Sequence, residues 1–96
     1  MATAARMVYS HITKDPEICG GRACIDGTRV RVLDIAALAY GGQTPSQIQS
    51  AYPALSLAQV HAALSYAYEY PKEIEAQLEE DHRLAERIDR DRAGLR

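Results

Sequence analysis

Three arginines, Arg22, Arg29 and Arg31, lie close together around an Asp26-Gly27 pair. Guanidinium groups bind phosphate oxygens through charge-assisted hydrogen bonds. Residues 32–71 contain neither Lys nor Arg, so any attraction of the folded core to phosphate must start at these three side chains. The spacing therefore predicts a basic, phosphate-binding element within residues 20–32.

A tight hairpin is the element that would position these arginines. Two β-favouring runs, residues 23–25 and 30–32, flank the Asp26-Gly27 pair. An Asp-Gly pair between such runs indicates a β-hairpin, because Gly tolerates positive φ. We expect Arg22, Arg29 and Arg31 to project from this hairpin. The preceding Gly20-Gly21 pair lacks the spacing of a phosphate-binding loop or a dinucleotide fingerprint, so we interpret it as a turn.

A second group of charged residues, Glu79, Glu80 and Asp81, lies in a segment that we expect to be helical over residues 72–92. A narrow apolar stripe and several i,i+4 ion pairs characterise this segment. The pattern favours a helix that gains lasting order by placing its stripe in a groove of a partner. The alternative is a solvated helix that packs loosely on its own domain. The stripe comprises Ile74, Leu78, Ala85 and Ile88.

Catalysis is not predicted. Consecutive carboxylates on a helix point in different directions, and no His stands near a Ser or Cys in a nucleophile motif. The two cysteines, Cys19 and Cys24, and three scattered histidines do not form a four-ligand zinc pattern. We expect reduced thiols and no metal, cofactor or small-molecule substrate.

Length and composition set wider bounds. A chain of 96 residues with a net charge of −2 and a pI near 5.9 has no overall basic footprint for nucleic acid. No apolar run reaches membrane-spanning length, and the first ten residues lack a signal-peptide core, so we expect a cytoplasmic protein without membrane contact. We divide the chain into a folded domain, residues 1–71, which should fold without the rest, and a partner-binding helix, residues 72–96.

Residues 7–13 alternate like a single strand, with Val8, Ser10 and Ile12 on one side. Three helices follow. The second has Thr44 as N-cap and the third has Ser56, each completing a capping box with a Gln three positions later. Gly41-Gly42 and Tyr52-Pro53 separate the helices. The predicted ranges are 33–40, 45–51 and 57–70.

The third helix has two distinct faces. Its apolar face should fill the core against Ile35, Leu38 and Ile48, and its outward face carries mainly small residues, so direct reading of bases by this helix is poor. Tyr66, Tyr68 and Tyr70 suit a protein interface, and the alternative is that they rim the core. The predicted core face is Leu57, Val60, Leu64 and Ala67, and the outward face is Ala58, Ala62, Ser65 and Glu69.

The chain resembles a small prokaryotic family, domain of unknown function 433, over residues 12–70. Ala23 stands where the family often has proline, and Val30 where it often has isoleucine. The resemblance rests on Asp15-Pro16-Glu17-Ile18-Cys19-Gly20-Gly21-Arg22, on Gly27-Thr28-Arg29-Val30 and on Tyr52-Pro53.

The resemblance implies a VapB-like antitoxin with a helix-turn-helix fold, encoded beside a PIN-like ribonuclease toxin. It implies DNA binding and self-repression by the helix-turn-helix part, and toxin neutralisation mainly by the C-terminal segment. A stand-alone helix-turn-helix regulator with no toxin partner is the competing hypothesis.

The predicted fold is mainly α with a small β element: an N-terminal strand and hairpin, a three-helix homeodomain-like or winged helix-turn-helix core, and a C-terminal amphipathic helix. We expect a homodimer formed through the N-terminal strand and hairpin. The predicted DNA-binding residues are Arg22, Arg29, Arg31, Gln47, Gln59 and His61. The predicted toxin-binding residues are Tyr70, Ile74, Leu78, Glu79, Glu80, Asp81 and Ile88.

Overall fold

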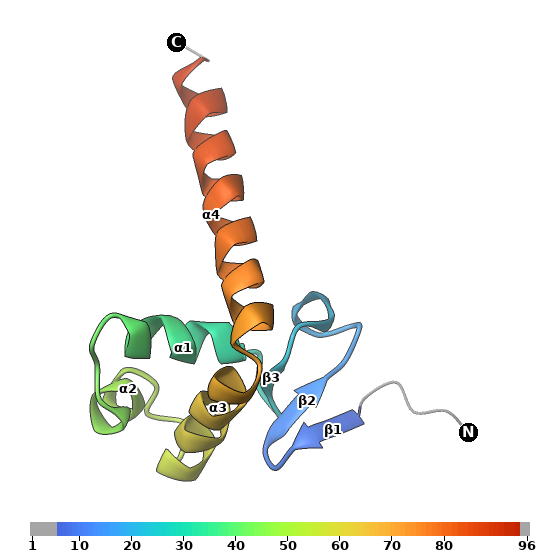
Figure 1. Cartoon of the computed structure of the whole chain (residues 1–96), viewed down its shortest axis with the longest axis vertical. Helices are drawn as coiled ribbons and strands as arrows, with labels where there is room; N and C mark the ends of the chain where they lie inside the picture. The colour runs from blue at the N-terminus through green and yellow to red at the C-terminus, as the bar shows by residue number, and fades with distance from the viewer. Residues whose placement is uncertain (1–5, 95–96) are drawn as a thin grey trace.

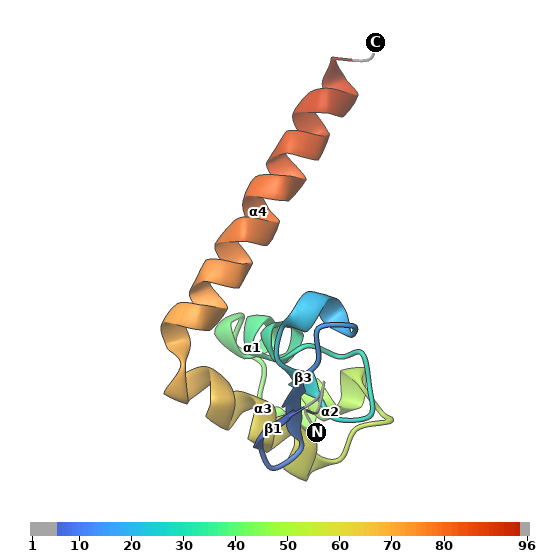
Figure 2. The ribbon, with the colours of Figure 1, turned by 90° about the vertical axis from the view of Figure 1, so that its right-hand side faces the viewer.

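A computed structural model of the chain describes the backbone of residues 6–94 and the side chains from Ser10 onward. A small sheet and three helices form a body, and a fourth, long helix rises from it (Figure 1). The view turned by 90° also shows the long helix extending away from the body (Figure 2). The elements are β1 (Arg6–Tyr9), β2 (Ile12–Lys14), the 3-10 turn η1 (Cys19–Gly21), β3 (Cys24–Ile25), α1 (Val32–Tyr40), α2 (Pro45–Ala51), α3 (Leu57–Glu69) and α4 (Pro71–Ala93).

The sheet is antiparallel with the order β1-β2-β3. The prediction of one strand over residues 7–13 is wrong, because the chain reverses at Ser10 and His11 and forms β1 and β2 instead. His11 has φ 69°, a left-handed conformation that His adopts more readily than most residues. Pairing two short strands satisfies backbone groups that a single strand would leave open. The Val8 side chain lies outside the described side chains.

The Asp26-Gly27 hairpin is present, but its second run is not a strand. The backbone N–H of Ile25 donates to the carbonyl of Val30 at 2.9 Å, and Gly27 has φ 80°, as expected for this pair. Only Arg31 forms a β-bridge, to Cys24, before α1 begins at Val32. The hairpin therefore connects the sheet directly to the first helix.

The predicted helices are confirmed with small shifts at their ends. α2 has the predicted bounds, and α4 is one residue longer at each end. Both capping boxes form: the backbone N–H of Gln47 donates to Thr44 Oγ1 at 3.2 Å, and that of Gln59 to Ser56 Oγ at 3.1 Å. These helix starts are determined by local side-chain hydrogen bonds.

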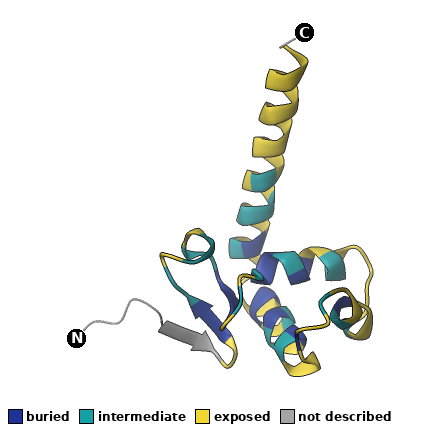
Figure 3. Ribbon diagram, turned by 180° about the vertical axis from the view of Figure 1, so that it is seen from behind, coloured by how far each residue is buried: buried dark blue, intermediate teal, exposed yellow. Residues whose placement is uncertain are grey.

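One hydrophobic core joins the sheet to all four helices (Figure 3). Val60 and Ala67 are buried as predicted, and Leu64 is half-buried. The placement of Leu57 in the core is wrong: it is 44% exposed, because the first residue of α3 lies at the rim of the body. The remaining buried apolar residues of α3 are Ala63 and Tyr66.

The first turn of α4 also belongs to this core, since Ile74 is fully buried in it. The fold is thus mainly helical with a small antiparallel sheet. Among residues 6–94, every helix is too short or too polar to span a bilayer.

Candidate functional site

Charged side chains from three separate segments meet where α4 leaves the body. Arg22 follows η1, Arg31 immediately precedes α1, and Asp34 lies in the first turn of α1. Glu80 and Asp81 come from the middle of α4. We call these five residues the junction cluster.

A left-handed turn brings Arg22 to this position. Cys19, Gly20 and Gly21 all have positive φ, at 55°, 65° and 84°. Glycine adopts this conformation without steric cost, which explains the Gly20-Gly21 pair as turn chemistry. The interpretation of that pair as a turn is confirmed.

Arg22 binds both α4 carboxylates at once. Its Nη1 donates to Asp81 Oδ1 at 3.0 Å and Oδ2 at 3.2 Å, and its Nη2 donates to Glu80 Oε1 at 2.9 Å. The Arg22 side chain is only 19% exposed. Both terminal nitrogens of this guanidinium are therefore engaged by α4.

Arg31 completes the cluster from the other side. Its Nη2 donates to Asp34 Oδ1 at 2.9 Å, and its Nη1 lies 3.6 Å from Asp81 Oδ2. The hydrogen bond to Asp34 raises the pKa of Arg31, although partial burial opposes that shift. Asp34 also accepts from the backbone N–H of Arg31 at 3.0 Å, so it holds the guanidinium and caps α1 together.

The junction cluster thus brings together residues that the sequence analysis assigned to DNA binding and residues that it assigned to toxin binding. Arg22 and Arg31 do not project freely from the hairpin, which corrects that expectation, because Glu80 and Asp81 of the same chain neutralise them. Arg29 is exposed, and no side-chain partner of Arg29 is found among residues 10–94.

A second group of polar side chains joins the start of α4 to the body. Tyr66 of α3 donates to Glu73 at 2.9 Å, and Lys14 of β2 forms an ion pair with Glu73 at 3.1 Å. Burial and then the Glu73 hydrogen bond raise the pKa of Tyr66. Burial alone would lower the pKa of Lys14, but Tyr66 and Glu73 outweigh it and raise this pKa.

The apolar stripe of α4 divides into two parts. Ile74 is buried and Leu78 packs against the core, so these two predicted toxin anchors are engaged inside their own domain, which corrects that assignment. Ile88 is 46% exposed, and Leu84, which the sequence analysis did not single out, is 53% exposed. Tyr70 is 42% exposed with its ring centroid 4.8 Å from that of Tyr66.

The remaining predicted site residues stand apart from the junction cluster. Glu79 lies on the exposed side of α4, 3.7 Å from Arg83. The side-chain oxygens of Gln47 and Gln59 accept from the backbone N–H groups of Thr44 and Ser56, so they serve the caps.

An open groove of about 640 Å³ runs along the outward face of α3. His61 lines it, as do the predicted outward residues Ala58, Ala62 and Ser65. No Lys or Arg is among its lining residues in the described part of the chain. Its other lining residues are Ser10, His11, Pro45, Leu64 and Tyr68.

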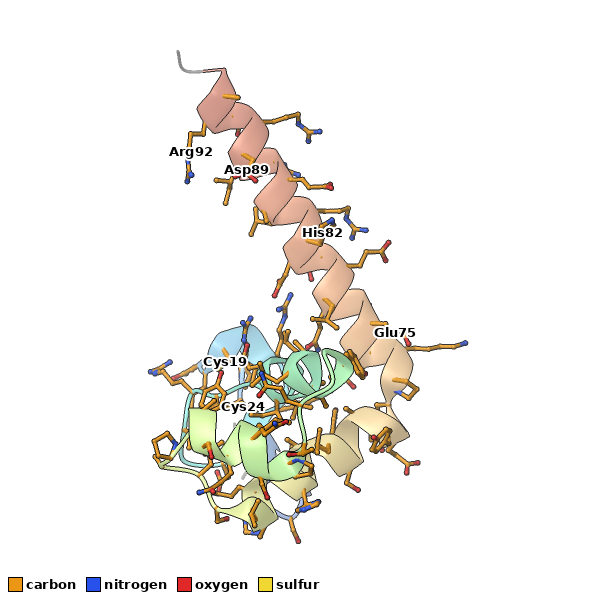
Figure 4. All side chains as sticks on the ribbon, turned by 90° about the vertical axis from the view of Figure 1, so that its left-hand side faces the viewer. Cys19, Cys24, Glu75, His82, Asp89 and Arg92 are labelled. Carbon is orange, nitrogen blue, oxygen red and sulfur yellow. The ribbon has the colours of Figure 1, made fainter. Side chains whose placement is uncertain are left out.

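Cys19 lies in η1 and Cys24 in β3 (Figure 4), and both are free thiols. Cys24 is fully buried, and this burial is the largest cause that raises its pKa to about 11. Its thiol therefore remains protonated near neutral pH. Among the described residues, no group of three or more His, Cys, Asp or Glu side chains could hold a metal ion.

Comparison with known proteins reveals a relative of known fold. A crystal structure of a DUF433 member protein from Anabaena variabilis ATCC 29413 has 30% sequence identity and a TM-score of 0.66. The match covers 74% of this chain and 70% of that chain. A fold similar to that of about three quarters of this chain thus occurs in a solved structure.

A curated relative and a family match agree with this likeness. The uncharacterised protein y4eO of Sinorhizobium fredii is 35% identical over 60 residues, which are 62% of this chain and only 27% of that relative. The family described as "Protein of unknown function (DUF433)" matches residues 12–67. This range contains the hairpin, Arg22, Arg31, α1, α2 and all but the last two residues of α3, and the chain therefore belongs to the DUF433 family.

Proposed function

We propose that this protein is an antitoxin that neutralises a PIN-like ribonuclease by direct binding through the exposed C-terminal half of α4, residues 82–93. The observation that carries the proposal is the exposed apolar pair Leu84 and Ile88 on a helix that continues beyond the body. Exposed apolar side chains at i,i+4 spacing, bordered by charges, are typical of a helix that binds in a groove.

DNA binding is the second part of this proposal. α1, α2 and α3 would form a tri-helical helix-turn-helix unit, with the hairpin beside it as a wing. Arg29, in the hairpin, is an exposed cation three residues before α1. Because the α3 groove lacks basic side chains, phosphate contacts from the hairpin would dominate affinity, and sequence discrimination by Gln47, Gln59 and His61 would be modest.

A homodimer remains part of the proposal. β1 lies at the edge of the sheet, paired with β2 on one side. An edge strand presents backbone groups that a second chain can pair with. Such pairing would place two hairpins side by side for two half-sites on DNA.

The central test is co-expression with the PIN-like ribonuclease encoded by an adjacent gene. Removal of residues 84–96 should abolish inhibition, because it deletes the exposed pair but keeps Ile74, Leu78 and Asp81. A cut after Tyr70, which the predicted domain boundary suggests, is less informative because it would open the core at Ile74.

A finer variant avoids truncation. Replacing both Leu84 and Ile88 by Ala should weaken binding at least tenfold, since two anchors are lost. Leu57→Ala is the matched control, because Leu57 is an equally exposed apolar residue at the far end of the body. Equal inhibition by the wild type and the 84–96 deletion would reject the C-terminal half of α4 as the neutralising surface. Absence of inhibition by the wild type would favour the stand-alone regulator.

A further inference from the structure

We propose that Glu80 and Asp81 occupy, within the same chain, a phosphate-binding site formed by Arg22 and Arg31, so that DNA binding requires this part of α4 to leave the hairpin. This inference rests on the proposed DNA-binding function and adds a regulatory step to it. The site is the junction cluster, and its present occupants are the two α4 carboxylates.

The geometry of the cluster is that of an anion site. Arg22 directs both of its terminal nitrogens at carboxylate oxygens, with donor–acceptor distances of 2.9–3.2 Å. Arg31 approaches the same Asp81 carboxylate from α1. Carboxylate and phosphate both match the planar fork of a guanidinium, so a phosphate group could take the place of either carboxylate.

Phosphate and α4 must compete for this site. Because Nη1 and Nη2 of Arg22 are both engaged and its side chain is 19% exposed, little room is left for a second anion. Asp34, Glu80 and Asp81 also surround the two guanidinium groups with negative charge, which would repel a phosphate. A DNA backbone would therefore replace the carboxylates rather than join them.

The position of the cluster on α4 makes release feasible. Ile74 and Leu78 hold the start of the helix in the core, and Glu80 and Asp81 follow Leu78 by less than one helical turn. Residues 82–94 are exposed (Figure 3). Glu80 is 68% exposed and Asp81 38%, so solvent screens these ion pairs and their opening should be reversible.

Opening of the junction cluster would couple the predicted DNA-binding surface to the predicted toxin-binding surface. DNA bound at Arg22 and Arg31 would free Glu80 and Asp81 for a basic partner. By linkage, a partner that draws these carboxylates away would strengthen DNA binding by the same factor.

The test compares two full-length double variants of equal charge. Glu80→Gln with Asp81→Asn releases the arginines, whereas Glu75→Gln with Asp89→Asn removes the same charge from exposed α4 residues outside the cluster. On operator DNA, the first variant should bind about tenfold more tightly than the second, with the salt slope steeper by about 2 for two additional phosphate contacts. Equal gains in both variants would overturn the proposal, because net charge alone would explain them.

A second measurement separates this proposal from DNA binding itself. In NMR spectra of the side-chain N–H groups, inorganic phosphate should shift Arg22 and Arg31 in the Glu80→Gln, Asp81→Asn variant but not in the control. If phosphate shifts these signals but no variant binds DNA, the anion site is supported and the proposed DNA function fails. If DNA binds but phosphate leaves both arginines unshifted, the proposed function stands and the competition is refuted.

Discussion

The two halves of α4 both place apolar side chains among charged ones, but their surroundings differ. In the first half, Ile74 is buried in the core and Asp81 is bound by two arginines of the body. In the second half, Leu84 and Ile88 are about half exposed, and His82 contacts Glu86 of the same helix, with 3.2 Å between Nε2 and Oε2. Figure 4 shows Asp89 and Arg92 well beyond the body.

This contrast shows that one continuous apolar stripe on a charged helix can stabilise the fold at one end and remain exposed at the other. Burial of an Ile side chain stabilises the fold by roughly 1.5–3 kcal/mol, whereas an exposed i,i+4 pair contributes only tenths of a kcal/mol. The first half is therefore part of the domain, and the second half gains comparable stabilisation only from a partner. The first half of α4 thus serves folding, and the second half is left for partner binding.

The largest expected difference between the halves comes from removing one apolar side chain in each. Ile74→Ala should destabilise the fold by about 2–5 kcal/mol, because it leaves a cavity in a fully packed site. Ile88→Ala should change the stability by less than about 0.5 kcal/mol. Urea unfolding followed by circular dichroism measures both, and equal losses would show that the second half is also packed on the body.

A smaller difference is expected from removing one carboxylate charge in each half. Asp81→Asn should lower the stability by about 1 kcal/mol at low salt, since it weakens contacts to Arg22 and Arg31 that are only partly screened. Asp89→Asn, on the exposed half, should be near neutral. Raising the salt concentration should shrink the Asp81 effect, and an effect that does not depend on salt would argue against an electrostatic origin.

The smallest expected effect is a loss of stability at alkaline pH that arises from the contacts of the first half of α4 with the body. Because the folded state raises the pKa of Tyr66 above its ordinary value of 10.0, folding favours the neutral phenol. This contribution is complete below pH 10 and is lost as the pH rises through the raised pKa. The raised pKa of Lys14 acts in the same direction.

Thermal melts from pH 9 to pH 11 test this behaviour. Tyr66→Phe should reduce the alkaline loss, because the phenol that must stay protonated is gone. Tyr68→Phe is the control, since Tyr68 is 79% exposed and should leave the pH profile unchanged. A Tyr66→Phe profile identical to that of the wild type would show that this phenol does not titrate with unfolding.

Much of the fold could be predicted because its signals are local. The capping residues Thr44 and Ser56 define where α2 and α3 begin, and the Asp26-Gly27 pair defines a turn. The reversal at Ser10 and His11 could not be predicted because this segment has no Gly, Pro, Asn or Asp to indicate a turn, and only the pairing of β1 with β2 requires a left-handed residue there. Leu57 was misplaced because helical periodicity gives a face but not where the neighbouring elements end.

The sequence by itself determined the helices, their caps, the glycine turns and the identity of the charged and apolar residues, since these depend on contacts between near neighbours in the chain. Only the tertiary structure decided which charges meet. Arg22 and Asp81 are 59 positions apart, and neither carries a local signal for the other. Their pairing depends on where Ile74 anchors α4, and that anchor turned a predicted DNA-binding residue and a predicted toxin-binding residue into partners in one cluster.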